Sequence, residues 1–126
     1  MSSSRKPFDK TLIKSFGYAF KGIATLMRSE RNAWIHVAVT IAVIAAGIIL
    51  GLTRGEWIAV SIAIAMVLAG EAFNSAVEKV CDHATTECHP LIGDAKDLAA
   101  AGVLITAVGA VAVGLIIFVP KIWALL

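Results

Sequence analysis

The chain has 126 residues, of which 59% are hydrophobic and only 16% are charged. Soluble domains are closer to half apolar and a quarter charged, and so short a chain cannot bury this much apolar surface, so an ordinary soluble domain is excluded. Residues 1–32 sum to +5 and the remainder to −3, and a basic leader before apolar stretches indicates contact with an anionic membrane surface rather than with nucleic acid.

The first predicted element is an amphipathic helix over residues 8–28. At about 100° per residue, its basic side chains fall on one side and its apolar side chains on the other. The basic side consists of Lys10, Lys14, Lys21 and Arg28. Such a helix lies in the membrane interface, with its lysines among the lipid headgroups. We expect this lysine-rich leader to hold the N-terminus in the cytoplasm.

Three predicted transmembrane helices follow, over residues 33–52, 57–82 and 98–119. The first has about the 20 apolar residues that a membrane span requires. Trp34 and Trp57 stand at span ends, where amphipathic rings favour the interface. The second span becomes charged in its C-terminal part and is expected to extend into the cytoplasm. The whole chain is predicted to be one all-α membrane domain, residues 1–126.

The third span is expected to be separated from the second by a polar connection over residues 83–97. Pro90 and Gly93 are expected to break that connection, and Pro120 is expected to close the span. Small side chains recur at every fourth position of the span, at Gly102, Thr106, Ala110 and Gly114. Such a stripe lets helices approach closely and favours an oligomer.

A polar ridge marks the C-terminal part of the second span. It consists of Glu71, Asn74, Glu78 and Asp82, which fall within about 80° of arc on a helix. Ionisable groups at membrane depth are costly, and they are by default functional or paired. A hard cation such as Mg²⁺ would offset the repulsion between the carboxylates. The alternative, in which these acids only pair with basic residues of the leader, explains their number less well.

Other familiar sites are missing from the sequence. It has no phosphate-binding glycine loop, no dinucleotide fingerprint and no His-Glu-x-x-His motif. Two cysteines and two histidines could offer zinc ligands, but their spacing fits no common zinc module: Cys81, His83, Cys88 and His89. His36 stands on an otherwise apolar span and is expected to be hydrogen-bonded to a neighbour.

Taken in order, these motifs resemble the small prokaryotic diacylglycerol kinases and the related undecaprenol kinases. The resemblance covers roughly residues 10–119. It is carried by Lys14, Gly17-Tyr18, Lys21-Gly22, Glu30, Glu71-x-x-Asn74-Ser75-Ala76-Val77-Glu78-x-x-x-Asp82, Glu87-x-His89 and Lys96-Asp97. The resemblance implies a surface helix and three spans assembled as a homotrimer in the bacterial inner membrane, with active sites between subunits.

The resemblance also implies an ATP- and Mg²⁺-dependent lipid kinase and assigns its residues. Glu71 matches the general base, which takes the proton of the lipid hydroxyl, and Glu30 and Glu78 match the metal ligands. The nucleotide site would be lined by Tyr18, Asn74, Glu87, Cys88, His89, Lys96 and Asp97. Where enterobacterial members carry an arginine, this chain has Thr11, and Lys10 or Lys14 would make the lipid or phosphate contact instead.

Two questions stay open at the level of the sequence. The lipid is undecaprenol or diacylglycerol, and Ser29-Glu30-Arg31-Asn32 and His89-Pro90-Leu91 look more like the undecaprenol kinases. The competing function is a small proton-coupled transporter or a structural oligomer, because a membrane carboxylate such as Glu71 would also serve a proton carrier.

Overall fold

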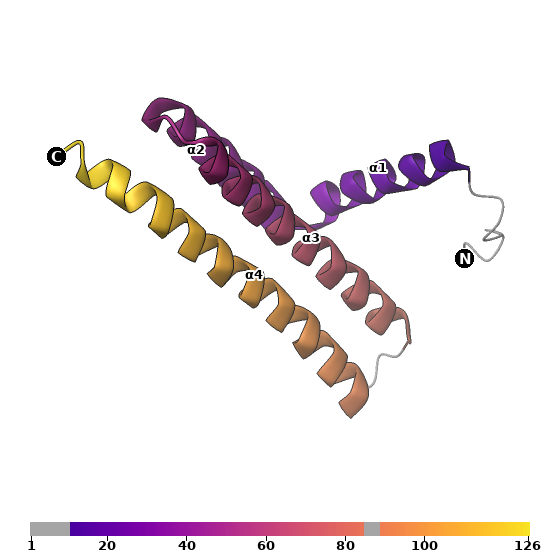
Figure 1. Cartoon of the computed structure of the whole chain (residues 1–126). Coiled ribbons are helices and arrows are strands. Elements are labelled where there is room, and N and C mark those ends of the chain that lie inside the picture. Colours follow the sequence, from indigo (N-terminus) through magenta and orange to yellow (C-terminus); the bar gives the residue numbers. More distant parts are fainter. Residues whose placement is uncertain (1–10, 85–88) are drawn as a thin grey trace.

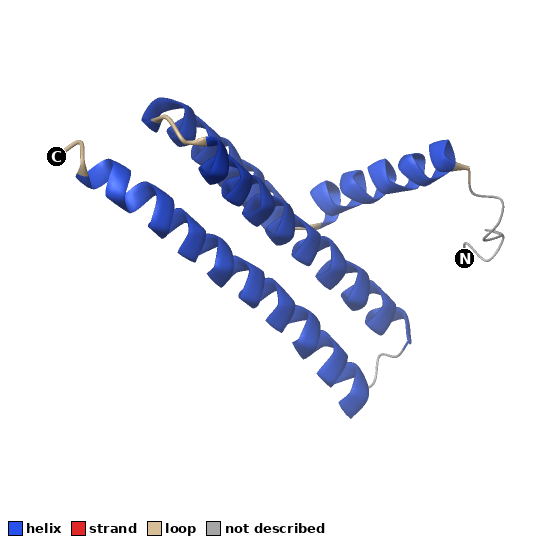
Figure 2. Cartoon of the chain, viewed as in Figure 1, coloured by secondary structure: helices blue, strands red, loops and turns tan. Residues whose placement is uncertain are grey.

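The computed structural model describes residues 11–84 and 89–126, which form four α-helices joined by short connections (Figures 1 and 2). In chain order they are α1 (Leu12–Ser29), α2 (Arg31–Leu50), α3 (Arg54–Ala84) and α4 (Pro90–Trp123). α3 packs along α4, while α1 projects away from the other three helices (Figure 1). The prediction of an all-α chain, with an amphipathic helix before three long apolar ones, is confirmed.

α1 begins at a side-chain cap, and most of its apolar face is exposed. The Thr11 hydroxyl accepts a hydrogen bond from the backbone N–H of Lys14 (3.2 Å), one of the free N–H groups of the first turn. Arg28 lies in the last turn, where a cation offsets the negative end of the helix dipole. The large apolar side chains of this helix are exposed: Leu12, Ile13, Phe16, Phe20 and Ile23. This face is suited to insertion into the membrane interface.

The connection between α2 and α3 is held by a glycine cap and a capping box. Gly51 ends α2 in the left-handed region (φ 75°), which glycine adopts without a Cβ clash. The Thr53 N–H donates to Glu56 Oε1 (2.9 Å), and the Glu56 N–H donates to Thr53 Oγ1 (3.2 Å). The same Glu56 oxygen lies 3.0 Å from Lys121 Nζ, so this end of α4 is tied to the connection.

α4 begins at Pro90, so the expectation that Pro90 and Gly93 break the polar connection is wrong. Proline suits the first helical turn because the N–H it lacks would have no helical partner there. His89 caps the helix by accepting the Leu91 N–H on Nδ1 (3.2 Å), and a single glycine costs a helix only about 1 kcal/mol. The helix also continues past Pro120 to Trp123, so Pro120 does not close it.

The stripe of small residues on α4 is used within the chain at one position. A Cβ added to Gly70 on α3 would lie 3.1 Å from Oγ1 of Thr106, so the two helices approach closely there. A Cβ added to Gly102 or Gly114 would meet no atom of another residue within 4 Å in the described structure. Thr106 therefore serves packing between α3 and α4, in addition to any role of the stripe between subunits.

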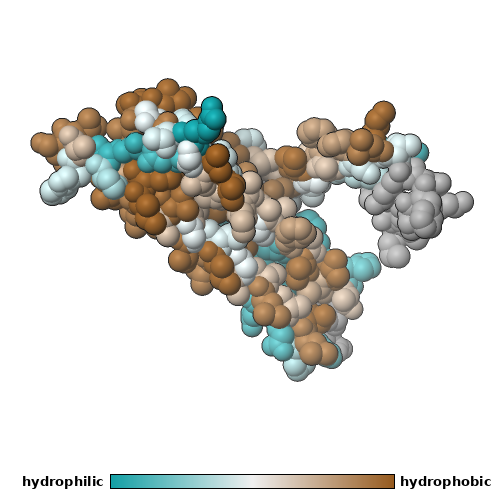
Figure 3. Space-filling model, in the orientation of Figure 1, coloured by the Kyte–Doolittle hydropathy of each residue, from teal (hydrophilic) through white to brown (hydrophobic). Residues whose placement is uncertain are grey.

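Three of the helices are long and apolar enough to cross a membrane. They are α2, α3 and α4, and each contains a strongly apolar stretch of 18 residues with few charged side chains. Hydrophobic residues cover most of their visible surface (Figure 3), and many large ones are exposed, among them Ile41, Ile48, Ile62, Leu104 and Ile116. Because the exposure of so much apolar surface to water is unfavourable, lipid must solvate it. The chain is a multi-pass membrane protein.

Candidate active site

The acidic side chains of α3 lie at different depths along one helix. α3 has 31 residues, which makes it about 46 Å long against an apolar bilayer thickness of roughly 30 Å. With Trp57 at one interface, Glu71 lies about 21 Å along the helix and Glu78 about 32 Å. For a helix that stands upright in the membrane, this spacing would put Glu71 at the level of the lipid chains and Glu78 at the opposite membrane boundary.

Glu71 is the most enclosed charged side chain of this group. Its residue is 7% exposed, and its Oε1 lies 2.8 Å from Nε2 of His36 on α2. The prediction that His36 is hydrogen-bonded to a neighbour is confirmed. An ionised carboxylate accepts hydrogen bonds only, so the imidazole donates whenever Glu71 carries its charge. A buried carboxylate with one fixed donor is a suitable proton acceptor at membrane depth.

An amide and a carboxylate lie together one turn further along α3. Asn74 Nδ2 donates to Glu78 Oε1 (3.3 Å). The Oδ1 of Asn74 and the Oγ of Ser75 are buried without a hydrogen-bond partner in the described residues. Since a buried polar atom left unpaired is costly, Asn74 Oδ1 is an acceptor free for a donor or a cation from outside the described chain.

The end of α3 is joined to the start of α4 by an ion pair. Lys96 Nζ donates to Asp82 Oδ1 at 2.6 Å, beyond the apolar part of both helices. This hydrogen bond, together with the charge of Asp82, raises the pKa of the Lys96 ammonium, which stays protonated at neutral pH. The next residue, Asp97, and the capping residue His89 are both exposed at the same end of α4.

Glu30 stands at the corner between α1 and α2. It ends the first helix and precedes the second in an extended conformation, and its side chain makes no capping hydrogen bond. The corner is fixed by Trp34, whose Nε1 donates to the carbonyl of Met27 (2.8 Å). The C-terminal half of α1 also contacts α3, with a groove of about 350 Å³ between them that Leu26 and Ser75 help to line. The corner thus keeps Glu30 at the junction of α1 and α2.

The other two predicted residues of α1 lie on its surface. The side chain of Lys14 is exposed, and Tyr18 is partly buried. Tyr18 makes a polar or ring interaction of its own. Both residues are therefore presented by the helix that is suited to the headgroup region.

The chain also matches known proteins. The family model for prokaryotic diacylglycerol kinase matches residues 17–118. The chain belongs to the prokaryotic diacylglycerol kinase family. It is 38% identical to an undecaprenol kinase of Bacillus subtilis over 109 residues, which are 86% of this chain and 89% of the relative. It is thus a membrane lipid kinase, and the kinase chemistry implies ATP as phosphate donor.

Two diacylglycerol kinases are further relatives. The protein from Escherichia coli K12 is 34% identical over 108 residues, which are 79% of this chain and 82% of the relative. The protein from Synechocystis is 34% identical over 116 residues, covering 91% of this chain and 66% of the longer relative. The family is therefore shown along most of the chain, whereas the relatives differ in the lipid that their names state.

Some predicted site residues of this lipid kinase fall outside the described structure, namely Lys10, Glu87 and Cys88. Of the possible zinc ligands, Cys81 is buried and has a free thiol, and His83 and His89 are exposed. Residues 11–84 and 89–126 contain no group of three His, Cys, Asp or Glu side chains that could hold a metal. A metal bound by fewer side chains must therefore complete its coordination with substrate or with other groups.

The described partners of the predicted acids differ from the alternative in which these acids pair with basic residues of the leader. Glu71 pairs with His36 on α2 and Asp82 with Lys96 on α4, and neither is paired with a residue of α1. The identity of the hydrogen-bond partner of His36, which is Glu71, is the feature that sequence reasoning missed. Hydropathy marks His36 as unusual on its span, but its partner lies 35 positions away and depends on how α2 packs against α3.

Proposed function

We propose that this lipid kinase transfers the γ-phosphoryl group of ATP, with Mg²⁺, to the primary hydroxyl of undecaprenol. The observation that carries the proposal is the staggered pair of carboxylates on α3. Glu71 is buried, and the rise along α3 would put it at the depth of the lipid chains and Glu78 at the boundary that faces water. A lipid hydroxyl and a nucleotide phosphate approach from these two sides, so one helix would serve both substrates.

Glu71 is the proposed general base. The lipid hydroxyl gives its proton to the carboxylate while its oxygen attacks the γ-phosphorus, and the bond from that phosphorus to the bridging oxygen of ADP breaks. The proton then rests on Glu71 until product release, and the lipid leaves as its phosphate. Transfer of this kind depends chiefly on positioning and on neutralisation of charge. A buried carboxylate held by His36 suits the positioning role.

Glu78 and Glu30 are the proposed ligands of Mg²⁺. The unpaired Oδ1 of Asn74 stands next to Glu78, so oxygen donors gather at this turn of α3. Mg²⁺ prefers oxygen and is held in kinases by one or two carboxylates together with substrate phosphates, which fits a described chain without a three-ligand cluster. When bound, the ion would neutralise charge on the phosphates.

The remaining predicted residues are proposed to hold the nucleotide and the lipid phosphate. The charged end of α4 carries Lys96 and Asp97, and His89 caps the same helix. We assign them, with Tyr18, Asn74, Glu87 and Cys88, to the nucleotide. Lys14 on the exposed side of α1, with Lys10, is assigned to the headgroup or phosphate, since Thr11 is used as the helix cap.

Undecaprenol is favoured over diacylglycerol by two observations. The Bacillus subtilis relative named undecaprenol kinase shares 38% identity, against 34% for the Escherichia coli diacylglycerol kinase. The local sequences at Ser29–Asn32 and His89–Leu91 point the same way. The test is a thin-layer assay of the purified protein with labelled ATP, Mg²⁺ and each lipid in turn. A higher kcat/KM for diacylglycerol would contradict the substrate, and no transfer to either lipid would contradict the kinase.

Shared active sites in a trimer are part of the proposal, as is a cytoplasmic N-terminus at the inner membrane. The open faces of α2 and α4, and the unpaired buried atoms of Asn74 and Ser75, leave room for contacts from a second copy. Mass measurement in mild detergent would give the copy number, and an active monomer would contradict shared sites. The rival function, a proton carrier built on Glu71, predicts ATP-independent proton flux into liposomes instead.

A further inference from the structure

His36 is the one polar group that α2 presents to the buried carboxylate of α3. Its Nε2 lies 2.8 Å from Glu71 Oε1, and the two side chains are 25% and 9% exposed. The partners come from different helices, so their contact depends on the packing of α2 against α3. A fixed donor on one carboxylate oxygen restricts the rotation of the Glu71 side chain. It would also leave the second oxygen, Oε2, to receive a proton from the substrate.

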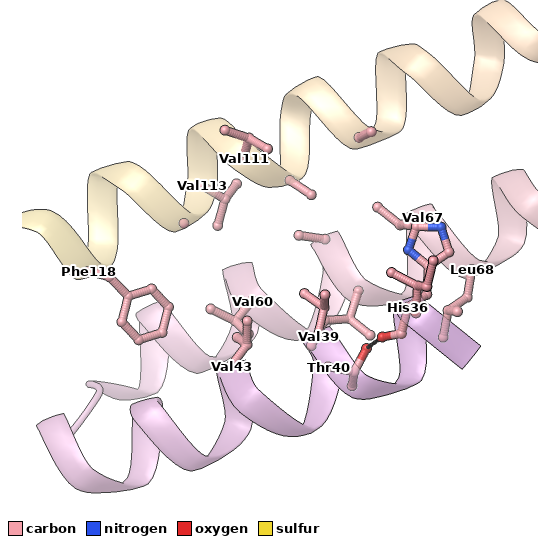
Figure 4. Close-up of a pocket in the computed structure, with 16 residues that line it drawn as sticks. His36, Val39, Thr40, Val43, Val60, Val67, Leu68, Val111, Val113 and Phe118 are labelled. Carbon is pink, nitrogen blue, oxygen red and sulfur yellow. Dashed lines mark hydrogen bonds between the residues drawn. The ribbon is translucent and has the colours of Figure 1, made fainter. Parts of the chain in front are cut away.

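The surroundings of His36 favour a single orientation of its ring. The ring lies at one end of an apolar cavity of about 390 Å³ between α2, α3 and α4, next to Val67 and Leu68 (Figure 4). The nearby hydroxyl of Thr40 is already committed, because it donates to the backbone carbonyl of His36 (2.7 Å). With apolar groups around the rest of the ring, Glu71 is its strong polar partner. A hydrogen bond to a charged group in such a site is worth more than one in water.

We propose that His36 is a positioning residue for the lipid kinase reaction. It donates from Nε2–H to Glu71 Oε1 and holds the carboxylate so that Oε2 meets the lipid hydroxyl. This inference rests on the proposed role of Glu71 as base, and it adds a residue that acts on the substrate only through Glu71. The neutral imidazole carries its proton on Nε2, so Nδ1 is unprotonated.

The decisive experiment compares three variants in detergent micelles that contain undecaprenol, Mg²⁺ and ATP. His36→Leu introduces an apolar side chain of similar length and removes the hydrogen-bond donor. The kcat should then fall about 10- to 100-fold, with the KM for ATP unchanged. His36→Gln restores an N–H at a similar distance and should recover most of that loss. Thr40→Val is the matched control, since it alters the same cavity without touching Glu71, and it should keep wild-type turnover.

A double-mutant cycle separates this inference from the function on which it rests. In a Glu71→Gln background, His36→Leu should cause no further loss, because two residues that act as one unit are not additive. If Glu71→Gln is inactive while His36→Leu is fully active, the positioning role is wrong and the base assignment stands. If Glu71→Gln keeps full activity, both are wrong. A His36→Gln variant that is folded and as slow as His36→Leu would also overturn the inference.

Nitrogen NMR of the labelled histidines provides a test that does not depend on the leucine variant folding. The His36 signals, assigned by their loss in His36→Gln, should report the Nε2–H tautomer in the wild type. Glu71→Gln should shift these signals and leave those of His83 and His89 in place. An Nδ1–H tautomer, or signals indifferent to Glu71→Gln, would overturn the proposed hydrogen bond.

Discussion

Lys96 on α4 donates a 2.6 Å hydrogen bond to Asp82 on α3, and so closes the connection between the two helices at the charged end of the molecule. The pair is partly exposed, so water and salt weaken its contribution to stability. Its position suggests a second role, because Asp82 holds the Lys96 ammonium near the turn that carries Glu78. In the proposed reaction, a cation held there would bind a nucleotide phosphate.

We expect Lys96→Gln to raise the KM for ATP about 10-fold, since a charge-assisted hydrogen bond to phosphate is lost. The KM for the lipid should stay the same. Asp82→Asn leaves the ammonium in place and should change the KM for ATP less than Lys96→Gln does. Steady-state kinetics with each substrate varied in turn measures both effects. Equal changes in the two KM values would show that Lys96 acts on the fold and not on the nucleotide.

Glu71→Gln should lower turnover by about 10²–10⁴, the usual worth of a general base, with ATP affinity little changed. Glutamine keeps the shape of the side chain but cannot take up the proton. Single-turnover transfer of labelled phosphate to undecaprenol measures the chemical step, and nucleotide binding is followed separately. A variant that loses ATP binding in parallel with turnover would argue that Glu71 holds the nucleotide instead.

Glu78→Gln should fail in a different way, although the side chain lies on the same face two turns further along α3. If Glu78 binds the metal, the variant needs more Mg²⁺ for half-maximal activity, and added Mg²⁺ should restore part of the rate. The same Mg²⁺ titration applied to Glu71→Gln is the control and should restore nothing. Equal rescue of both variants, or of neither, would show that the two roles are assigned wrongly.

The ion pair between Glu56 and Lys121, at the other end of the molecule, predicts a loss of stability in acid. The pKa of Glu56 is lowered, first by the hydrogen bond from the Thr53 N–H and then by Lys121. A carboxylate whose pKa is lower in the folded than in the unfolded protein stabilises the fold at every pH above its unfolded pKa. This stabilisation is lost as the pH falls through the pKa of the folded state. The thermal midpoint should therefore drop as the pH falls below about 5, because the unfolded glutamate begins to take up its proton there.

Glu56→Gln should have a lower thermal midpoint than the wild type at neutral pH and a smaller further drop in acid. The matched control is Asp94→Asn, because Asp94 is an exposed acid on α4 without a hydrogen bond or ion pair in the described structure. This control should keep the full acid-induced drop of the wild type. Light-scattering or fluorescence melts in one detergent across the pH series make the comparison.

A side chain at Gly47 should destabilise the packing of α2 against the start of α3. A Cβ there would lie 2.7 Å from Cη2 of Trp57 and 2.9 Å from Cδ1 of Leu52, well inside van der Waals contact. Gly47→Ala should destabilise the α2–α3 hairpin by about 1–3 kcal/mol, the usual cost of overpacking. Gly55→Ala is the control, since its Cβ would meet nothing within 4 Å. Thermal melts in detergent measure both variants, and equal thermal midpoints for Gly47→Ala and Gly55→Ala would contradict this packing.

The sequence alone determined the three apolar helices, the amphipathic α1 and the order of polar groups along α3. These features are local, because hydropathy and helical periodicity within one segment fix them. The ridge from Glu71 to Asp82 could be recognised for the same reason, since one helix places its members on one side. The prediction for Pro90 was wrong because proline usually indicates a break between helices, whereas here it occupies the first turn of α4.

Only the tertiary structure decided which side chains meet across helices. The contacts of Glu71 with His36 and of Asp82 with Lys96 join residues 35 and 14 positions apart. Their geometry depends on how α2 and α4 cross α3, which is set by close approaches such as Gly70 against Thr106. Hydropathy cannot supply those crossing angles, because lipid solvates every apolar face equally well and only the shape and polarity of the packed side chains distinguish one face from another.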